Sequence, residues 1–243
     1  MTNPAVIREL DARGVATVTL NRPTVNNAYN AELIAGLLTT LDVLFSQSSL
    51  RVVVIRGAGR HFQAGADLAW LNEVAQASYD DNLAASRATA EAVHRLNNVP
   101  VPTVALIQGG CFGGGTGIAA ACDVVIAADN AIFSIAETRW GLIPGIIIPQ
   151  LNDAIGARQV RRYALTGERF DAHEARRIGL VHEVVPLAEL EAAGAKAVDR
   201  LLQNAPEANA QTKAIAIEHA WGDLSPERLA RLIEQHAVKR QSA

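Results

Sequence analysis

Disulfide pairs, long apolar runs and an export signal are all missing from this sequence. Two cysteines among 243 residues cannot form the disulfide framework of a secreted chain. No run of about 18 apolar residues occurs, so we expect no membrane-spanning helix. The first residues, MTNPAVIREL, carry charges and no apolar core, which is unlike a signal peptide. We therefore expect a cytoplasmic protein.

A strong excess of charge of one sign is also missing. The formal net charge is −3 and the isoelectric point is near 6.1, so the basic surface typical of nucleic-acid binding is not indicated. Hydrophobic residues make up 49% and charged residues 19%, which is typical of a folded domain and excludes general disorder. A length of 243 residues suits one domain, or one domain with an appendage.

What is present is an alternation of strand and helix patterns. Ala5–Leu10 and Val15–Leu20 are predicted strands, joined by a turn that contains glycine. Asn30 is expected to cap a helix, because apolar residues follow it at helical spacing: Leu33, Ile34, Leu37, Leu38, Leu41, Leu44 and Phe45. Val52–Ile55 and Thr103–Ile107 are short and continuously apolar, as buried parallel strands are.

The rest of the chain continues the alternation. Further strands are predicted at residues 124–127, 131–134 and 181–185, with helices over residues 79–98 and 171–179. Beyond residue 186 the chain is expected to be helical, because apolar residues recur at Leu187, Leu190, Leu201, Leu202, Ile215, Ile217, Leu229, Leu232 and Ile233. This order predicts an α/β fold with parallel strands.

A glycine-rich loop follows each of the two apolar strands. The first runs from Gly57 to Gly65 and the second from Gly109 to Gly117. Glycine lets a backbone approach a ligand closely, and a loop that enters a helix leaves N–H groups without helical partners. One N–H from each loop could therefore form an oxyanion hole. The alternative is that both loops are tight turns that pack helices against strands.

Glu137 is a second candidate for chemistry. It follows a predicted strand in a mostly apolar stretch, and apolar surroundings raise the pKa of a carboxyl group. A raised pKa suits a general acid or base. The alternative is an ion pair with Arg139 or an exposed loop position.

Other chemistries find little support. The six histidines lack the spacing of metal ligands, so we expect no metal, and His61 is interpreted as a positioning residue. Neither a nucleophile elbow nor a phosphate loop is present. Gly115–Ala120 fits a dinucleotide fingerprint only weakly, because no second nucleotide-binding half follows. Cys111 is expected to be a small buried thiol.

Several motifs occur together in one order along almost the whole chain. They are Asn21-Arg22-Pro23 with Asn27-Ala28, residues 62–68 (FQAGADL), Gly113-Gly114-Gly115 with Cys122-Asp123, Phe133 with Glu137, Gly141 with Pro144, Leu165-Thr166-Gly167, and Ala175 with Gly179. In this set the chain resembles the enoyl-CoA hydratase/isomerase (crotonase) superfamily.

The resemblance implies a fold, an assembly and a substrate class. The fold would be a spiral of ββα turns over residues 1–185, followed by a helical oligomerisation region over residues 186–243. The expected assembly is a homotrimer or a dimer of trimers. The expected substrate is an acyl-CoA thioester, with no further cofactor.

The resemblance also implies roles for individual residues. The N–H groups of Ala66 and Gly114 would stabilise the thioester oxygen, and Glu137 would be the acid/base. The CoA and pantetheine path would be lined by Ala64, Ala66, Asp67 and Leu68, with Asn26 and Ala28 near the adenine end.

One departure from the family pattern concerns Gly117. Two-glutamate hydratases carry their first glutamate there, so only Glu137 remains of the pair. The chain is most similar to hydratases of branched or carboxylated enoyl-CoAs, such as methylglutaconyl-CoA hydratase. A carboxylated substrate would need a cation, for which Arg87 is the first candidate and Arg139 the second. The alternatives are a Δ3,Δ2-enoyl-CoA isomerase and a catalytically weak protein that binds RNA or a partner.

Overall fold

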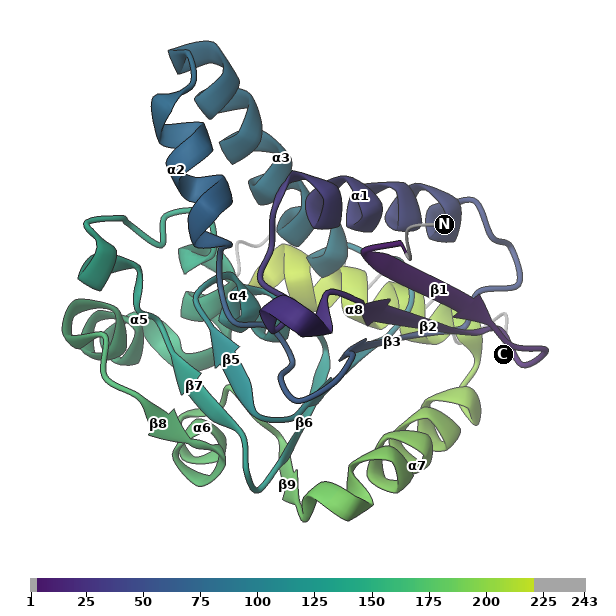
Figure 1. The fold of residues 1–243 in the computed structure, drawn as a ribbon. Coiled ribbons are helices and arrows are strands. Elements are labelled where there is room, and N and C mark those ends of the chain that lie inside the picture. The colour runs from purple at the N-terminus through teal and green to yellow at the C-terminus, as the bar shows by residue number, and fades with distance from the viewer. Residues whose placement is uncertain (1–3, 221–243) are drawn as a thin grey trace, which may run out of the picture.

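The fold is an α/β body built on two sheets (Figure 1). The computed structural model describes residues 4–220, so Leu229, Leu232 and Ile233 lie outside the described residues. The larger sheet has the order β1-β2-β3-β4-β6-β9 and the smaller sheet the order β5-β7-β8. β1 pairs antiparallel with β2, and every later neighbour in the larger sheet is parallel. The prediction of an α/β fold with parallel strands is confirmed.

The described strands and helices follow the predicted order. The larger sheet contains β1 (Val6–Leu10), β2 (Val15–Leu20), β3 (Val52–Gly57), β4 (Thr103–Ile107), β6 (Val124–Ala128) and β9 (Glu183–Val185). The smaller sheet contains β5 (Gly110–Phe112), β7 (Ile132–Ser134) and β8 (Phe170–Asp171). The helices are α1 (Ala31–Phe45), α2 (Leu68–Gln76), α3 (Tyr79–Asn97), α4 (Gly114–Ala120), α5 (Ile148–Thr166), α6 (Ala172–Ile178), α7 (Leu190–Leu202) and α8 (Pro206–His219).

A ββα unit repeats along the middle of the chain. β4, β5 and α4 form one turn, and β6, β7 and α5 form the next. The first strand of each turn enters the larger sheet and the second enters the smaller one. An isolated parallel bridge between Gln63 and Cys111 joins the two glycine loops in the same way. The predicted spiral is therefore present, and it stacks the two loops side by side.

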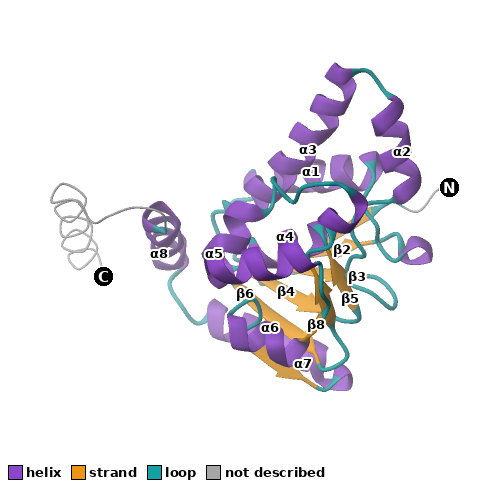
Figure 2. Ribbon diagram, turned by 90° about the vertical axis from the view of Figure 1, so that its left-hand side faces the viewer, coloured by secondary structure: helices purple, strands orange, loops and turns teal. Residues whose placement is uncertain are grey.

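Helices cover both faces of the larger sheet (Figure 2). In β3, Val53 and Ile55 join the core cluster that includes α1 and α3, whereas Val52 and Val54 pack in a second cluster with α7. A strand with both faces buried has no polar side, which explains its continuous apolar sequence. α7 therefore packs in a core shared with the sheet, although it lies within residues 186–243, the predicted oligomerisation region.

Two elements beside the site escaped the sequence analysis. α2 buries none of its residues fully and is nine residues long, so its apolar residues, Leu68, Leu71 and Val74, give too short a pattern to reveal a helix. Its start is fixed by Asp67, whose Oδ1 accepts a hydrogen bond of 3.1 Å from the Ala69 N–H. The second predicted loop also contains β5 and the first turns of α4. The strand predicted over residues 181–185 is shortened to β9.

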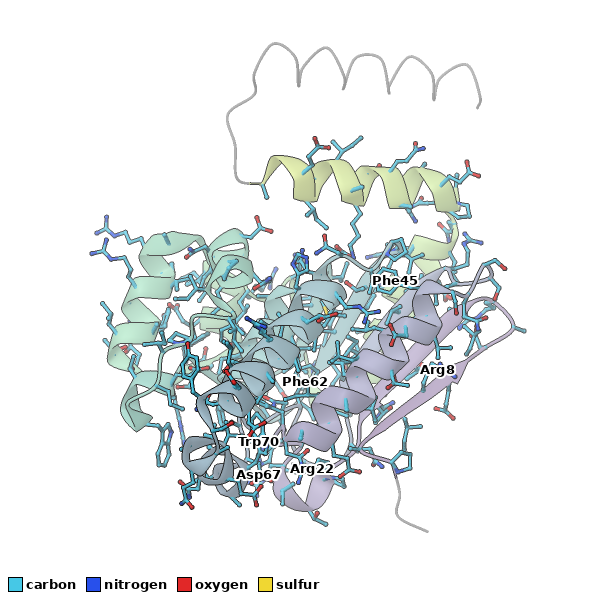
Figure 3. All side chains as sticks on the ribbon, turned by 90° about the horizontal axis from the view of Figure 1, so that it is seen from above. Arg8, Arg22, Phe45, Phe62, Asp67 and Trp70 are labelled. Atoms are coloured by element: carbon cyan, nitrogen blue, oxygen red, sulfur yellow. The ribbon has the colours of Figure 1, made fainter. Side chains whose placement is uncertain are left out.

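α8 lies beside the body and makes few polar contacts with it (Figures 2 and 3). Lys213 Nζ lies 2.8 Å from Asp123 Oδ2 and donates to the Val101 carbonyl at 3.2 Å. Asp123 also accepts from the backbone N–H and the hydroxyl of Thr103. One lysine therefore ties α8 to the loop that precedes β6.

Candidate active site

A cavity of about 170 Å³ opens between the two glycine loops and the loop that carries Glu137. Five of the predicted site residues line it: Ala64, Ala66, Leu68, Gly114 and Glu137. The fold therefore brings together the two predicted oxyanion donors and the predicted acid/base, which are far apart in sequence.

The hydrogen bonds of Tyr29 orient the Ala66 N–H. Tyr29 forms a parallel bridge with Ala66, in which the Tyr29 N–H donates to the Gly65 carbonyl at 2.9 Å. The Asp67 N–H donates back to the Tyr29 carbonyl, also at 2.9 Å. In a parallel bridge of this kind, the N–H of the residue between the two bonded ones, here Ala66, points away from the partner strand. Among the described residues, the Ala66 N–H has no acceptor, so it is free to bind a ligand oxygen.

The Gly114 N–H is free because it opens a helix. Gly114 is the first residue of α4, and its N–H finds no acceptor in the described part of the chain. Gly113 before it has φ of +50°, and a Cβ there would lie 2.9 Å from Glu137 Oε1. Only glycine fits such a position, because it combines a left-handed backbone with close approach to another group.

Three side chains that received no catalytic role from the sequence hold these loops. Gln63 is fully buried, and its amide both accepts from the Gly65 N–H and donates to the Gly65 carbonyl at 2.9 Å. His61 Nδ1 accepts from the Gly110 N–H at 2.7 Å, which agrees with the positioning role expected for His61. The Asn27 amide donates to three carbonyls of the first loop. Their place inside matched motifs was the signal available in the sequence.

Glu137 is partly buried and has no charged partner. Its Oε2 is enclosed and finds no hydrogen-bond partner in the described residues, and no ion pair joins it to Arg139 there. Burial raises the pKa of the Glu137 carboxyl above its ordinary value, and a hydrogen bond from its own backbone partly opposes that shift. A carboxyl group with a raised pKa beside a cavity accepts and holds a proton more readily than an ordinary glutamate does.

The space beside Gly117 is already filled. A Cβ on Gly117 would lie 2.2 Å from Ile147 Cγ2 and 2.7 Å from Ile147 Cβ. Ile147 is buried, so it has little freedom to move aside. A second carboxylate at position 117 therefore has no room in this packing.

The residues expected along the CoA path are partly gathered here. The Ala64 N–H donates to the Asn26 carbonyl at 3.1 Å, which places the segment that contains Asn26 and Ala28 beside the first loop. Asp67 lies 3.1 Å from Arg22, and the two side chains lie at the same end of the molecule in Figure 3. Arg87, in contrast, is exposed on α3 and does not line the cavity.

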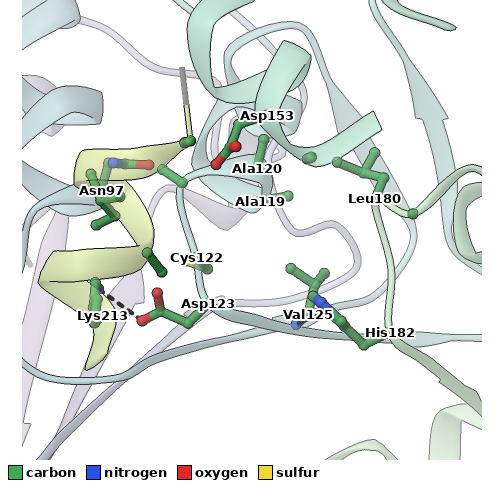
Figure 4. A pocket seen from close by; sticks show the side chains of 16 residues that line it. Asn97, Ala119, Ala120, Cys122, Asp123, Val125, Asp153, Leu180, His182 and Lys213 are labelled. Atoms are coloured by element: carbon green, nitrogen blue, oxygen red, sulfur yellow. Dashed lines mark hydrogen bonds and ion pairs between the residues drawn. The ribbon is translucent and has the colours of Figure 1, made fainter. Parts of the chain in front are cut away.

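A larger cavity, of about 390 Å³, lies between α8 and the body (Figure 4). Three of its polar groups have partners: Asp123 binds Lys213, and His182 Nδ1 accepts from the Val125 N–H at 3.0 Å. Asp153 also lines it, but none of the oxyanion donors or Glu137 does. Cys111 and Cys122 are both buried, as expected for Cys111, and burial raises the pKa of the Cys122 thiol to about 12. We therefore place the chemistry in the smaller cavity.

Neither a metal-binding cluster nor a membrane-spanning helix occurs in the described residues. Within residues 4–220, no three histidine, cysteine or acidic side chains are grouped to hold a metal ion. None of the described helices is long and apolar enough to cross a membrane.

Two free N–H groups and one unpartnered carboxyl group around a small cavity define a class of site. The N–H groups suit an oxygen that gains negative charge, and the carboxyl group suits proton transfer at a neighbouring carbon. This combination suits an enzyme that forms an enolate from a carbonyl compound.

Comparison with known proteins identifies the family. The sequence matches the family model described as enoyl-CoA hydratase/isomerase over residues 11–237. It is 35% identical over 199 residues to the hydroxycinnamoyl-CoA hydratase-lyase of Pseudomonas fluorescens, covering 79% of this chain and 71% of that protein. It is 30% identical over 238 residues to the mitochondrial Delta(3,5)-Delta(2,4)-dienoyl-CoA isomerase of Dictyostelium discoideum, covering 94% of this chain and 81% of that protein.

A solved structure agrees with these sequence relatives. The enoyl-CoA hydratase of Shewanella pealeana matches with a TM-score of 0.93 at 32% identity, covering 97% of this chain and 88% of that chain. The chain belongs to the enoyl-CoA hydratase/isomerase family and has its crotonase fold. The resemblance inferred from the sequence motifs is thereby confirmed at the level of the family.

Proposed function

We propose that the protein is an enoyl-CoA hydratase, which adds water across the 2,3-double bond of an enoyl-CoA thioester. The observation that carries this proposal is the enclosed, unpartnered Oε2 of Glu137 in the cavity that also receives the free N–H groups of Ala66 and Gly114. Family membership supports the thioester substrate.

One carboxylate is enough for the proposed reaction. The thioester oxygen sits between the Ala66 and Gly114 N–H groups, which draw electron density from the β-carbon. Glu137 takes a proton from water while the hydroxyl oxygen bonds to the β-carbon, and the double bond becomes an enolate. The protonated Glu137 then returns the proton to the α-carbon as the carbonyl reforms. Both hydrogens and the oxygen of the water end on the product.

The remaining expectations belong to this proposal. Asn26, Ala28, Ala64, Asp67 and Leu68 would contact the CoA moiety, and no cofactor besides the CoA of the substrate is required. We also propose a homotrimer or a dimer of trimers in the cytoplasm, with residues 186–243 contributing to the assembly. Light scattering that finds only monomer would contradict the assembly. RNA binding is not proposed, because the chain lacks a net positive charge.

A Δ3,Δ2-enoyl-CoA isomerase is the second candidate. The observation that favours it is the 30% identity to a dienoyl-CoA isomerase over 94% of this chain, and isomerisation moves one proton and needs one carboxylate. Glu137 would remove a proton from C2 and return it at C4, without water.

The test combines loss of the conjugated enoyl-thioester absorbance with the mass of the product. Crotonyl-CoA represents unbranched substrates and 3-methylglutaconyl-CoA represents branched, carboxylated ones. A mass gain of one water supports the hydratase. Conversion of a 3-enoyl-CoA to its conjugated isomer, with no hydration of either substrate, would favour the isomerase. No reaction in either assay would count against both.

A further inference from the structure

A second, smaller cavity lies behind Tyr29. It has a volume of about 30 Å³ and shares the Tyr29 and Gly114 walls with the reaction cavity. Its other walls are mostly aliphatic and come from four places: Leu33 and Leu37 on α1, Val93 on α3, Ile118 on α4, and Ile147. One water needs about 10–15 Å³ of such space, so this cavity is too small for a length of acyl chain unless it joins the larger one.

The Tyr29 side chain forms the partition. Its Cε1 lies 2.7 Å from the position that a Cβ on Gly114 would take, so the ring packs directly against the oxyanion residue. The ring meets Trp70 edge-on, with 5.6 Å between the centroids. The two backbone hydrogen bonds to Gly65 and Asp67 fix the main chain of Tyr29. Its hydroxyl has no hydrogen-bond partner in the described part of the chain, so no polar contact there holds the ring in place.

The charges around the reaction cavity select against an anionic acyl group. No lysine or arginine lies among the described residues that line either cavity. The carboxyl group in the wall belongs to Glu137, which must carry a negative charge before it accepts a proton. A second carboxylate in the substrate would be repelled there and would find no cation. Leu68, Leu71 and Phe112 instead offer apolar contact.

We propose that Tyr29 is the specificity-determining residue for the acyl group, and that it restricts the site to short, neutral, apolar chains. The proposal rests on the proposed acyl-thioester function. Removing the Tyr29 side chain joins the two cavities, and a longer chain then enters the space between α1, α3 and α4. The ring, rather than the hydroxyl, makes the partition.

Saturated thioesters test this without any turnover. Calorimetry would compare binding of butyryl-CoA, octanoyl-CoA and glutaryl-CoA to the full chain. We expect the wild type to bind butyryl-CoA most tightly. Tyr29→Ala should raise octanoyl-CoA affinity relative to butyryl-CoA by at least about tenfold, because several methylene groups become buried. Tyr29→Phe should keep the wild-type order, and Tyr79→Ala, on an exposed tyrosine, is the matched control.

A second-site change guards against a folding artefact. Val93→Phe in the Tyr29→Ala background fills the second cavity and should restore the preference for butyryl-CoA. Tyr29→Leu replaces Tyr29→Ala if the alanine variant does not fold. An unchanged ratio of octanoyl-CoA to butyryl-CoA in the folded variant would overturn the partition. Tighter glutaryl-CoA binding by the wild type would overturn the neutral acyl group.

The outcomes also separate this proposal from the hydratase. A changed chain-length ratio without hydration of any enoyl-CoA contradicts the hydratase alone. Hydration with an unchanged ratio contradicts the role of Tyr29 alone. Failure to bind any of the three thioesters contradicts both.

Discussion

The surroundings of the Glu137 carboxyl favour proton transfer but lower the stability of the folded protein. Its Oε2 has lost water without gaining a partner among the described residues, and burial raises the pKa of the carboxyl. The base form is therefore lost at a higher pH than for an ordinary glutamate. The rate should fall as the pH drops through this raised value.

Glu137→Gln should separate catalysis from folding. We expect the hydration rate to fall by at least about a hundredfold, because general acid/base groups contribute about 10²–10⁴. The free energy of unfolding at pH 7 should rise, since the variant carries no charge in the enclosed site. That gain should vanish below the unfolded pKa, where the carboxyl is protonated in both states. Rate assays at pH 7 and urea unfolding at pH 7 and at a pH below the unfolded pKa check this. Glu73→Gln, at an exposed position, is the control.

Gly117 and Ile147 give a second test at this scale. Gly117→Ala would gain about 1 kcal/mol of helix propensity, but its Cβ would lie 2.2 Å from Ile147 Cγ2. Overpacking costs about 1–3 kcal/mol, so the clash should win and stability should fall. In the Ile147→Ala background the 2.2 Å contact with Cγ2 is gone but the 2.7 Å contact with Cβ remains, so the loss of stability should become smaller. A Gly117→Ala effect of the same sign and size in both backgrounds, measured by urea unfolding, would show that the two residues are not coupled.

At the scale of elements, Asn27 joins β2 to the first glycine loop. Its amide is fully buried and donates to the carbonyls of Ala58, His61 and Phe62 at 2.9, 2.8 and 3.2 Å. Its Oδ1 accepts from the Arg22 N–H, and its φ of +56° suits asparagine. The Asn27 side chain therefore joins three positions of the loop that carries Ala66 to the segment after β2.

Asn27→Ala should destabilise the protein by about 3 kcal/mol, because each buried group left without a partner costs about 1–3 kcal/mol. Asn27→Asp keeps the shape but turns the donor into an acceptor facing three carbonyls, so it should be at least as harmful. Urea unfolding measures both. Asn26→Ala, at the exposed neighbour that also has positive φ, separates backbone strain from lost hydrogen bonds. Equal effects at the two positions would contradict the role of the amide.

The elements that the sequence predicted correctly are those with a buried face. β3 and β4 were found because both faces are buried, and α1 because its apolar residues recur along one face. α2 was missed because it buries no residue fully. In the site, Ala66, Gly114 and Glu137 were predicted through ordered motifs, and the fold gathers them around one cavity. The meeting of Tyr29 with Glu137 and Gly114 depends on how α1, α2 and α4 pack, which local sequence does not encode.

At the scale of the whole molecule, Lys213 joins α8 to the loop before β6. The Lys213 side chain is only 8% exposed, and its ammonium group lies 2.8 Å from Asp123 Oδ2. Asp123 keeps its bonds to Thr103 without Lys213. Loss of the lysine charge should therefore release the helix while the core stays folded.

Lys213→Met keeps the apolar stem and removes the charge. We expect amide exchange in α8 to rise by at least about tenfold, while the main sheet keeps its protection, because local opening has its own free energy. Hydrogen-exchange mass spectrometry reads both regions in one experiment. Lys196→Met, at an exposed position on α7, is the matched control. Faster exchange in the sheet as well would show that α8 and the core open together.

The oxyanion donors have a consequence for mutational scanning. In the proposed reaction Ala66 and Gly114 would donate through the main chain, and the orientation of the Ala66 N–H comes from backbone pairing with Tyr29. Ordinary side-chain exchange leaves both donors in place, and proline alone among the natural residues deletes an N–H. An alanine scan would therefore test the Glu137 carboxyl directly, whereas Gly114→Ala would test the 2.7 Å approach of its Cβ to the Tyr29 ring and leave the N–H in place. The presence of the two N–H groups depends on the backbone conformation and not on side-chain identity. Sequence variation at residues 66 and 114 therefore reports the space available for a side chain.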